Sequence, residues 1–323
     1  MEDEICWNPT PGPITFEFDD PPPTNKVVWP PQIRALGVVM TNYCPIACRH
    51  CYNESSPKKA VKLQLDRLRD FVELLSTNGH PLQAIGLSGG EAVHHPEFSA
   101  AARHFSSKQL RVSCYTSGFG LDQTALRSMA QAGVSEIVFS SDSYHEVFLT
   151  QEKLLCLVRE ASKIFERTTV KITVSTQQEG WRRARSLKER LPSNVALVVQ
   201  PVLHIGRAVN NTGLAEKPWT FDSAPAKNCA KEFGALGINY DGKVYACCCV
   251  GSFTPGLEVG NIANISTYEE FCSHYLQNQT LRTIFATGWE SGRQHKCEHC
   301  HAQMSRSCGI PKARLHPLLQ VSN

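Results

Sequence analysis

Residues 41–52 read TNYCPIACRHCY and bring Cys44, Cys48 and Cys51 together, with three and then two residues between them. This spacing lets one loop present three thiolates to a single inorganic cluster. Cubane iron–sulfur clusters are normally held by four thiolates, so three leave one iron open to a substrate or cofactor. A zinc ribbon would instead contain two CxxC pairs, and a disulfide would leave one thiol over. The stretch therefore predicts an iron–sulfur site.

Composition limits the class of protein. The chain has 323 residues, enough for one sizeable domain and a smaller one, and its formal net charge of +3 does not indicate nucleic-acid binding. Ten of its fourteen cysteines lie at 44–51, 229–249 and 297–308, which favours metal sites in a reducing compartment. The acidic start does not resemble a secretory signal, and no apolar run is long enough to span a bilayer. We therefore expect a cytoplasmic protein.

Hydrophobic patterning predicts the fold. Residues 1–33 contain eight prolines, whose density favours an extended N-terminal arm over a helix. Downstream, short apolar runs alternate with amphipathic segments, as in a buried parallel sheet with helices between its strands. The expected strands are Ala35–Thr41, Leu82–Ser88, Leu110–Thr116, Glu136–Ser141, Thr168–Thr176 and Val195–Val202. Six such units predict an α/β fold whose sheet curves into a partial (βα)6 barrel.

Two of the segments between these strands carry clear helix signals. Leu65, Leu68 and Val72 recur at helical spacing. Asp122 is the expected N-cap of a later helix, and Gly133 suits the end of that helix.

The candidate functional residues follow the ends of the expected strands. In parallel barrels, functional residues lie on loops at the carboxyl ends of the strands. The cysteine stretch directly follows the first strand, and the second strand ends in GGE at 89–91. Two adjacent glycines let the backbone approach a ligand closely. Thr116 ends the third strand, and Ser141 and Asp142 follow the fourth.

The CxxxCxxC spacing followed by the aromatic Tyr52, with GGE after the next strand, resembles the signature of the radical S-adenosylmethionine (SAM) superfamily. The resemblance implies an enzyme in which a [4Fe-4S] cluster binds SAM, cleaves it reductively and yields a 5′-deoxyadenosyl radical that abstracts a hydrogen atom. It implies that Cys44, Cys48 and Cys51 ligate this cluster. Tyr52 is expected to shield the cluster near the adenine of SAM.

The resemblance also implies which residues contact SAM. The expected contacts are Gly89, Gly90, Glu91, Thr116, Ser141, Asp142 and Arg207. For Asp142 the alternative is a cap of the next helix, and for Arg207 it is a structural ion pair. His145 is expected to face solvent in the first turn of that helix. On the fifth strand, Lys171 and Thr173 belong to a polar face of which one member is expected to reach the cavity.

A second cysteine group follows the barrel. We expect the barrel to cover 34–208, a linker to cover 209–228 and a cysteine-rich domain to cover 229–323. An Asp-Gly turn at 241–242 predicts a β-hairpin that brings two cysteines of this domain together. The cysteines available as ligands are Cys229, Cys247, Cys297 and Cys300.

This pattern resembles the auxiliary-cluster domains called SPASM and twitch. The CxxC-x5-C-x3-C run of full SPASM domains is absent, so the resemblance favours the shorter form, with one auxiliary [4Fe-4S] cluster on those four cysteines. A structural zinc is the alternative. Cys248 and Cys249 adjoin one of the four and are candidate catalytic thiols that return a hydrogen atom to a substrate radical, with simple packing as the alternative. Cys308 has no assigned role.

At the level of reaction, the resemblance favours the branch that modifies ribosomally made precursor peptides by epimerisation, cross-linking or backbone cleavage and splicing. The implied partners are a precursor peptide, an electron donor such as flavodoxin or ferredoxin, and a separate peptide-recognition protein, with no nucleic acid or membrane. A small-molecule radical SAM dehydrogenase of natural-product biosynthesis and a non-enzymatic metal-binding module are the alternatives.

Overall fold

The computed structural model describes residues 5–7, 32–202, 206–210, 234–248, 257–279 and 281. The strands are β1 (Ile5–Trp7), β2 (Ala35–Val39), β3 (Ala84–Ser88), β4 (Arg111–Thr116), β5 (Glu136–Ser140), β6 (Arg167–Val174), β7 (Val195–Pro201), β8 (Ala235–Ile238), β9 (Lys243–Tyr245) and β10 (Glu258–Asn261). The helices are α1 (Leu65–Thr77), α2 (Phe98–Ser107), α3 (Gln123–Gln131), α4 (Ser143–Glu146), α5 (Gln151–Ile164), α6 (Gln177–Lys188) and α7 (Tyr268–Gln277), with 3-10 turns η1 (Ala92–His94) and η2 (Gly206–Asn210).

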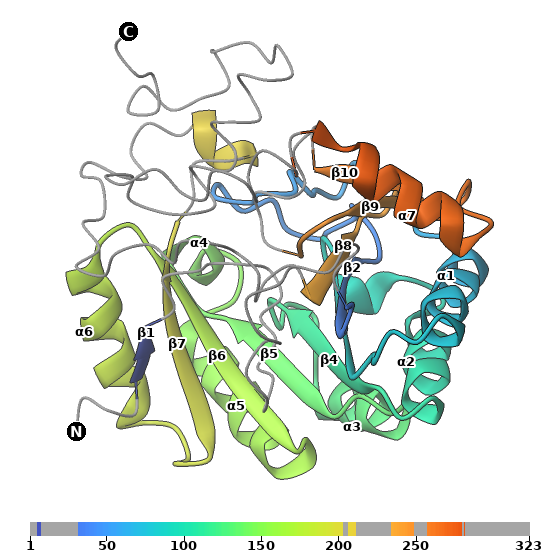
Figure 1. Cartoon of the computed structure of the whole chain (residues 1–323). Coiled ribbons are helices and arrows are strands. Elements are labelled where there is room, and N and C mark those ends of the chain that lie inside the picture. The colour runs from blue at the N-terminus through green and yellow to red at the C-terminus, as the bar shows by residue number, and fades with distance from the viewer. Residues whose placement is uncertain are drawn as a thin grey trace, which may run out of the picture.

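The described strands form one sheet in the order β1-β7-β6-β5-β4-β3-β2-β8-β9-β10. Strands β2 to β7 are parallel neighbours in chain order and correspond to the six strands expected from the apolar runs. Helices α1, α2, α3, α5 and α6 lie around the outer side of the curved sheet (Figure 1). The predicted partial (βα)6 barrel is therefore confirmed.

The local signals explain these elements. Strands β2 and β3 are buried at every position, as expected for continuous apolar runs covered on both faces. The Asp122 carboxylate accepts a hydrogen bond of 2.8 Å from the backbone N–H of Ala125 and so caps α3. Gly133 follows that helix with a φ of +93°, a conformation that glycine adopts without strain.

The sheet extends beyond the predicted six strands. At one edge β1 pairs in parallel with β7, so a short part of the proline-rich arm is an edge strand. At the other edge β8 pairs in parallel with β2, and β9 and β10 continue in antiparallel fashion. The expected hairpin turn at 241–242 connects β8 to β9. Of the predicted linker, only 209 and 210 belong to the described residues, and the three domain limits stay predictions.

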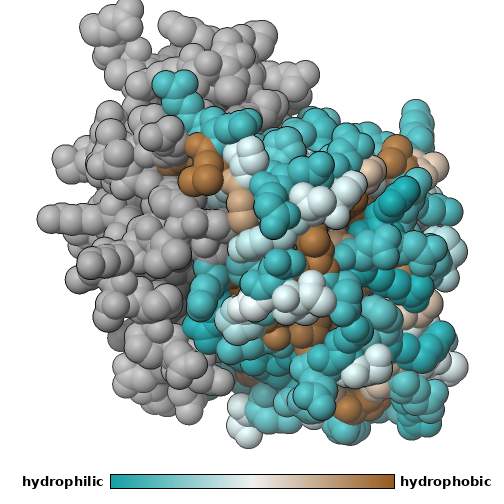
Figure 2. All heavy atoms as spheres, turned by 45° about the vertical axis from the view of Figure 1, so that its right-hand side comes forward, coloured by the Kyte–Doolittle hydropathy of each residue, from teal (hydrophilic) through white to brown (hydrophobic). Residues whose placement is uncertain are grey.

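Hydrophilic residues dominate the described face shown in Figure 2, and hydrophobic residues occur there in small separate areas. Among the described residues, the large hydrophobic side chains that are exposed are Val61, Val147, Phe148 and Leu276. None of the helices in the described ranges combines the length and the apolar character that crossing a membrane requires.

Helix α7 joins the C-terminal hairpin to the barrel. The ring of Phe271 is completely buried and meets the ring of Phe71 on α1 edge to face, with 5.7 Å between centroids. The rings of Phe271 and Tyr275, both on α7, lie 5.3 Å apart between centroids. The Tyr275 hydroxyl donates a hydrogen bond to the backbone carbonyl of Ala246, the residue after β9. Aromatic packing therefore ties α1, α7 and the hairpin into one unit.

We predict that Phe271→Ala lowers the free energy of unfolding by about 3–5 kcal/mol, because it removes a fully buried ring and leaves a cavity. Urea unfolding followed by circular dichroism measures the change. Leu276→Ala on the same helix is the matched control, since that side chain is 50% exposed. Equal losses in the two variants would contradict the docking role of Phe271.

Candidate active site at the carboxyl ends of the strands

The three cysteines of the opening stretch lie on the loop that follows β2. Cys44 and Cys48 are buried, Cys51 is half-buried, and all three pack in one group with Ile46 and Phe119. Burial raises the pKa of the Cys44 thiol to about 12, and the other two cysteines add to this effect. A thiolate is therefore costly here unless bound metal compensates its charge.

Main-chain contacts with the end of β3 hold this loop. The N–H of Gly90 donates to the carbonyl of Thr41 over 2.7 Å, and the N–H of Glu91 donates to that of Tyr43 over 2.9 Å. A Cβ on Gly90 would lie 2.1 Å from the Tyr43 oxygen, and one on Gly89 would lie 2.8 Å from the Thr41 oxygen. The glycines are therefore required for close packing against the cysteine loop. Their predicted contact with SAM stays a prediction.

The Glu91 side chain contacts the end of β4, and its predicted contact with SAM stays a prediction. Its buried side chain accepts hydrogen bonds from the backbone N–H of Ser117 at 3.0 Å and from its hydroxyl at 2.7 Å. Burial raises the pKa of the Glu91 carboxyl. The side chain therefore joins the carboxyl ends of β3 and β4, and it does not line the cavity described next.

The cysteines open onto a cavity of about 170 Å³ at the carboxyl ends of the strands. Its lining combines Cys44, Ile46, Cys48, His50, Cys51, Tyr52, Ser55, Ser88, Gly89, Gly90, Tyr115, Thr116, Ser117, Val138, Ser140, His145, Lys171, Thr173, Gln200 and Val202. The buried Lys171 ammonium lies 5.1 Å from the centre of the Tyr115 ring, a cation–π contact. The cavity lining thus combines sulfur with a cation and polar groups.

Several predicted cofactor contacts line this cavity and others do not. Tyr52, Gly89, Gly90 and Thr116 belong to its lining. Ser141, Asp142 and Arg207 are absent from it, as is Glu91. Gln200, Tyr115 and Ser140 also line the cavity, although no cofactor role was predicted for them. Their signal was present, because each lies at or near the carboxyl end of a predicted strand.

Arg207 contacts the cysteine loop itself. Its guanidinium donates to the backbone carbonyls of Cys48 and Ser55, and its own N–H donates to the carbonyl of Cys51 over 3.0 Å. A Cβ on the preceding Gly206 would lie 2.2 Å from the carbonyl oxygen of Tyr52. The segment after β7 therefore clamps the loop from a second side. The assignment of Arg207 to SAM stays a prediction.

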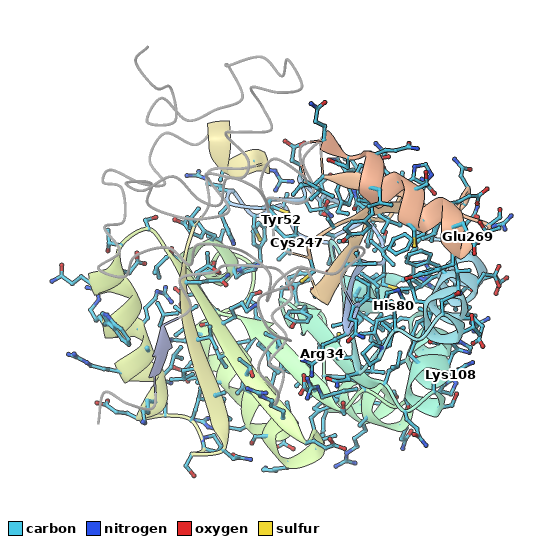
Figure 3. All side chains as sticks on the ribbon, viewed as in Figure 1. Arg34, Tyr52, His80, Lys108, Cys247 and Glu269 are labelled. Atoms are coloured by element: carbon cyan, nitrogen blue, oxygen red, sulfur yellow. The ribbon has the colours of Figure 1, made fainter. Side chains whose placement is uncertain are left out.

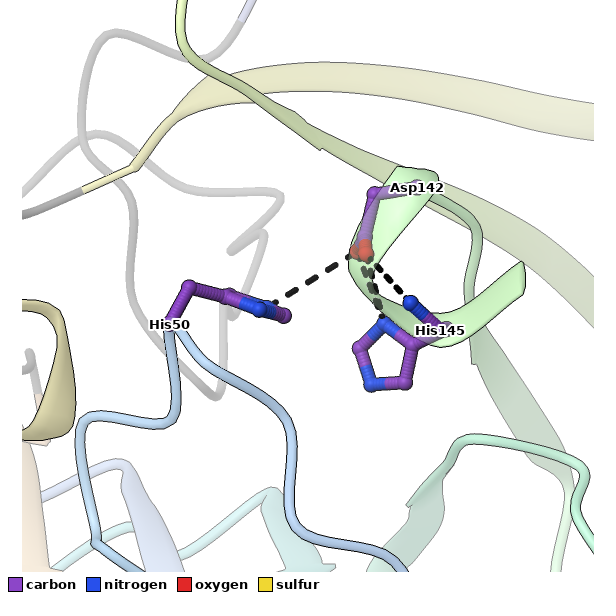
Figure 4. A group of neighbouring side chains, drawn as sticks. All are labelled: His50, Asp142 and His145. Atoms are coloured by element: carbon purple, nitrogen blue, oxygen red, sulfur yellow. Dashed lines mark hydrogen bonds and ion pairs between the residues drawn. The ribbon is translucent and has the colours of Figure 1, made fainter. Parts of the chain in front are cut away.

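A histidine and carboxylate group lies beside Cys48. Asp142 caps α4 by accepting from the N–H groups of Tyr144 and His145, as the capping alternative required. Its carboxylate also meets Nδ1 of His145 at 2.8 Å and lies 3.8 Å from Nε2 of His50 (Figure 4). The expectation that His145 faces solvent is wrong: its ring turns inward and lines the cavity. The cause is this hydrogen bond to a fully buried acceptor.

The pKa values in this group follow from burial and charge. Burial alone would raise the pKa of Asp142, but His145 and His50 outweigh it and lower that pKa to about 2. Burial lowers the pKa of His50 to about 4, so His50 is neutral near pH 7. Burial also opposes the charge on His145, but the adjacent Asp142 carboxylate raises the His145 pKa well above its usual value.

The auxiliary cysteines are only partly described. Cys247 is buried on the segment after β9 (Figure 3), while Cys229, Cys297 and Cys300 lie outside the described residues. Cys248 is buried against Ala35, Ala84 and Ala235, the first residues of β2, β3 and β8. That position is at the opposite end of the strands from the cavity. The catalytic role of Cys248 stays a prediction, and Cys249 lies outside the described residues.

The donor set fits an iron–sulfur cluster. Three sulfurs from one loop share a largely apolar surrounding, and the described cavity lining contains no carboxylate that would favour a hard cation such as Mg²⁺. Gly89 and Gly90 expose backbone beside those sulfurs, where a ligand of an open iron can approach. The residues present therefore agree with a [4Fe-4S] cluster that also binds a small cofactor.

Family comparisons agree with this geometry. Residues 38–190 match the Radical SAM superfamily, and residues 229–301 match SPASM, an iron–sulfur cluster-binding domain. The chain belongs to the radical SAM superfamily and is a radical SAM enzyme. Its cofactors are SAM and a [4Fe-4S] cluster, with an auxiliary iron–sulfur cluster in the C-terminal domain. The non-enzymatic alternative is thereby excluded.

Two curated proteins of Bacillus subtilis (strain 168) are similar in sequence. The putative peptide biosynthesis protein YydG is 19% identical over 226 residues, 67% of this chain and 69% of YydG. The antilisterial bacteriocin subtilosin biosynthesis protein AlbA is 28% identical over 79 residues, which are 24% of this chain and only 17% of AlbA.

Solved structures show the same fold. The structure of anSMEcpe with bound AdoMet aligns with a TM-score of 0.55 at 12% identity, over 88% of this chain and 97% of that one. Streptococcus suis SuiB bound to precursor peptide SuiA aligns with a TM-score of 0.55 at 9% identity, over 90% of this chain and 76% of SuiB. At these identities the likeness concerns the fold alone.

We predict that Gly90→Ala greatly reduces the iron held by the Cys44 loop, because the added methyl would overlap the Tyr43 carbonyl. Iron content and the absorbance of the reconstituted protein measure the loss. Gly234→Ala is the matched control, since a Cβ there meets its nearest atom at an ordinary 3.5 Å. Full iron content in the Gly90 variant would contradict the tight contact.

Proposed function

We propose that this radical SAM enzyme modifies a ribosomally made precursor peptide after translation. The observation that carries the proposal is the sequence similarity to YydG and AlbA, two proteins of peptide and bacteriocin biosynthesis. The match of residues 229–301 to SPASM supports it, since the resemblance to enzymes with such a domain favours the branch that modifies peptides. Epimerisation, cross-linking and backbone cleavage or splicing are the reactions proposed for the peptide.

The cysteines and the residues around the cavity divide the work. When bound, SAM and its cluster would supply radical hydrogen abstraction. Cys44, Cys48 and Cys51 hold the cluster, and the Gly90 and Arg207 contacts fix the loop that carries them. Lys171, Thr173 and Gln200 line the same cavity and are proposed to orient cofactor or substrate groups.

The proposal extends to partners and the second cluster. The substrate is a precursor peptide, an electron donor such as flavodoxin or ferredoxin reduces the cluster, and a separate protein delivers the peptide. Cys229, Cys247, Cys297 and Cys300 are proposed to hold one auxiliary [4Fe-4S] cluster, with zinc as the competing occupant. Oxidising and cross-linking reactions require an electron acceptor, and a fully ligated auxiliary cluster can serve as one.

Replacing Cys44, Cys48 and Cys51 together by Ala is expected to abolish formation of 5′-deoxyadenosine, because no open iron remains to bind SAM. The reduced, anaerobically reconstituted protein is incubated with SAM, and the product is measured by chromatography. Iron content should fall from about eight to about four per chain if both sites hold cubanes. A wild-type protein with one cluster and one bound zinc would instead show that the auxiliary site is a zinc site.

The substrate class is tested by co-expression. We expect a peptide encoded beside this gene to change in mass, or in the configuration of a residue, when it is expressed with the wild-type enzyme. Mass spectrometry, with chiral amino-acid analysis for a reaction that leaves mass unchanged, measures the product. The triple cysteine variant is the control. Deoxyadenosine formation with no change in any neighbouring peptide, and turnover of a small alcohol instead, would favour the dehydrogenase alternative.

A further inference from the structure

A short segment that follows the cysteine loop forms a basic surface. Residues 56–62, here called the lysine segment, contain Lys58, Lys59 and Lys62 and no acidic residue. Lys58 and Lys62 are exposed, Lys59 is half-buried, and the apolar side chain of Val61 is 49% exposed. Within the described part of the chain, none of these three lysines forms an ion pair. Their charges can therefore interact with a partner.

Hydrogen bonds hold the lysine segment against the cysteine loop. The Val61 carbonyl accepts from the N–H of Asn42 at 3.2 Å and from the hydroxyl of Thr41 at 2.9 Å. The Asn42 side-chain oxygen in turn accepts from the N–H of Val61 at 2.8 Å. At the start of the segment, the Ser56 carbonyl accepts from the N–H of Cys44 at 3.3 Å. The basic surface is therefore fixed to the loop that carries the predicted cluster ligands.

The lysine segment lies outside the cavity. Ser55, the residue before it, belongs to the cavity lining, but residues 56–62 do not. A partner bound to these lysines would therefore reach the cysteine loop from the protein surface, without entering the cavity. Electron transfer slows steeply with distance, so a protein that reduces the cluster has to dock close to this loop. Complexes of electron-transfer proteins are typically small and transient, and opposite charges on the two surfaces speed their formation.

We propose that the lysine segment is the docking surface for a small acidic electron-transfer protein, such as flavodoxin, that reduces the SAM-binding cluster. One electron leaves the reduced donor, which is thereby oxidised, and the cluster gains it. Val61 supplies an apolar contact within the basic surface. The inference rests on the electron donor named in the proposed function and is independent of which peptide is modified. An acidic peptide is the competing occupant.

The test follows reduction of the holoenzyme by reduced flavodoxin, without peptide, in an anaerobic stopped-flow spectrometer. Replacing Lys58, Lys59 and Lys62 together by Glu is expected to lower the second-order rate constant about tenfold or more at an ionic strength of about 0.01 M, because the surface then repels an acidic donor. The difference should largely vanish at about 1 M, where charges are screened. Reduction by dithionite at the higher ionic strength should be unchanged.

Two controls isolate the effect of position. Arg103, Lys153 and Arg182 are exposed on α2, α5 and α6, and replacing these three by Glu changes the net charge equally. This variant is expected to slow the reaction far less than the variant of the lysine segment. The same measurement on the triple cysteine variant gives the contribution of an auxiliary cluster, which is subtracted.

A second measurement needs no substitution. A carbodiimide joins a lysine to a carboxylate where two proteins touch, and mass spectrometry then locates the link. In the wild-type protein mixed with flavodoxin, we expect links at Lys58, Lys59 or Lys62. If the variant of the lysine segment fails to assemble its cluster, these links alone decide.

Three results would overturn the proposal. The first is an unchanged flavodoxin rate in a variant of the lysine segment with full iron content, and the second is a set of links confined to other lysines. The third is weaker binding of a precursor peptide by that variant with an unchanged flavodoxin rate, which would assign the surface to the peptide. Failure of the enzyme to modify any peptide would leave the flavodoxin rates unaffected, so it would count against the proposed function alone.

Discussion

The structure depends on a close main-chain contact between two strand ends. The Gly90 and Glu91 N–H groups bind the Thr41 and Tyr43 carbonyls, and this fixes the loop that carries the cysteines onto β3. The contact is possible because β2 and β3 are parallel and in register, so that both chains leave the sheet at the same edge. A side chain at Gly90 would fill the space occupied by the Tyr43 carbonyl. Gly89 and Gly90 therefore permit the close packing of the cysteine loop on β3, and both also line the cavity.

Short-range patterns explain why much of the fold could be predicted. Apolar runs such as Ala35–Val39 are buried on both faces. A parallel strand that is covered on both faces consists of consecutive apolar residues, which can be recognised in the sequence. The pairing of β8 with β2 could not be predicted. Strand β8 is only four residues long, and its first residue, Ala235, pairs with Ala35 about two hundred residues earlier in the chain. Edge strands β1 and β10 carry still less pattern.

The same distinction divides the site. The cysteine triad and the glycine pair are local motifs, and the sequence identified them. The residues that hold them are remote: Arg207 is 159 positions from Cys48, whose carbonyl it binds. The GGE motif predicts a cofactor contact for Glu91, and it could not show that the Glu91 carboxylate lies within 3.0 Å of Ser117. Periodicity cannot show such pairings, because they arise only when separate strands end at one edge of the sheet.

The sulfur atoms and the polar side chains that line the cavity come from different elements of the fold. The three cavity sulfurs come from the loop that follows β2. The cavity lining also contains Lys171, Thr173 and Gln200 from the neighbouring strands β6 and β7, and Thr173 pairs with Gln200. Cys248, by contrast, packs at the amino ends of the strands. A hydrogen atom returned from that place would have to cross the barrel interior, which weighs against the predicted thiol role of Cys248 and favours our proposal that residues of β6 and β7 orient the substrate.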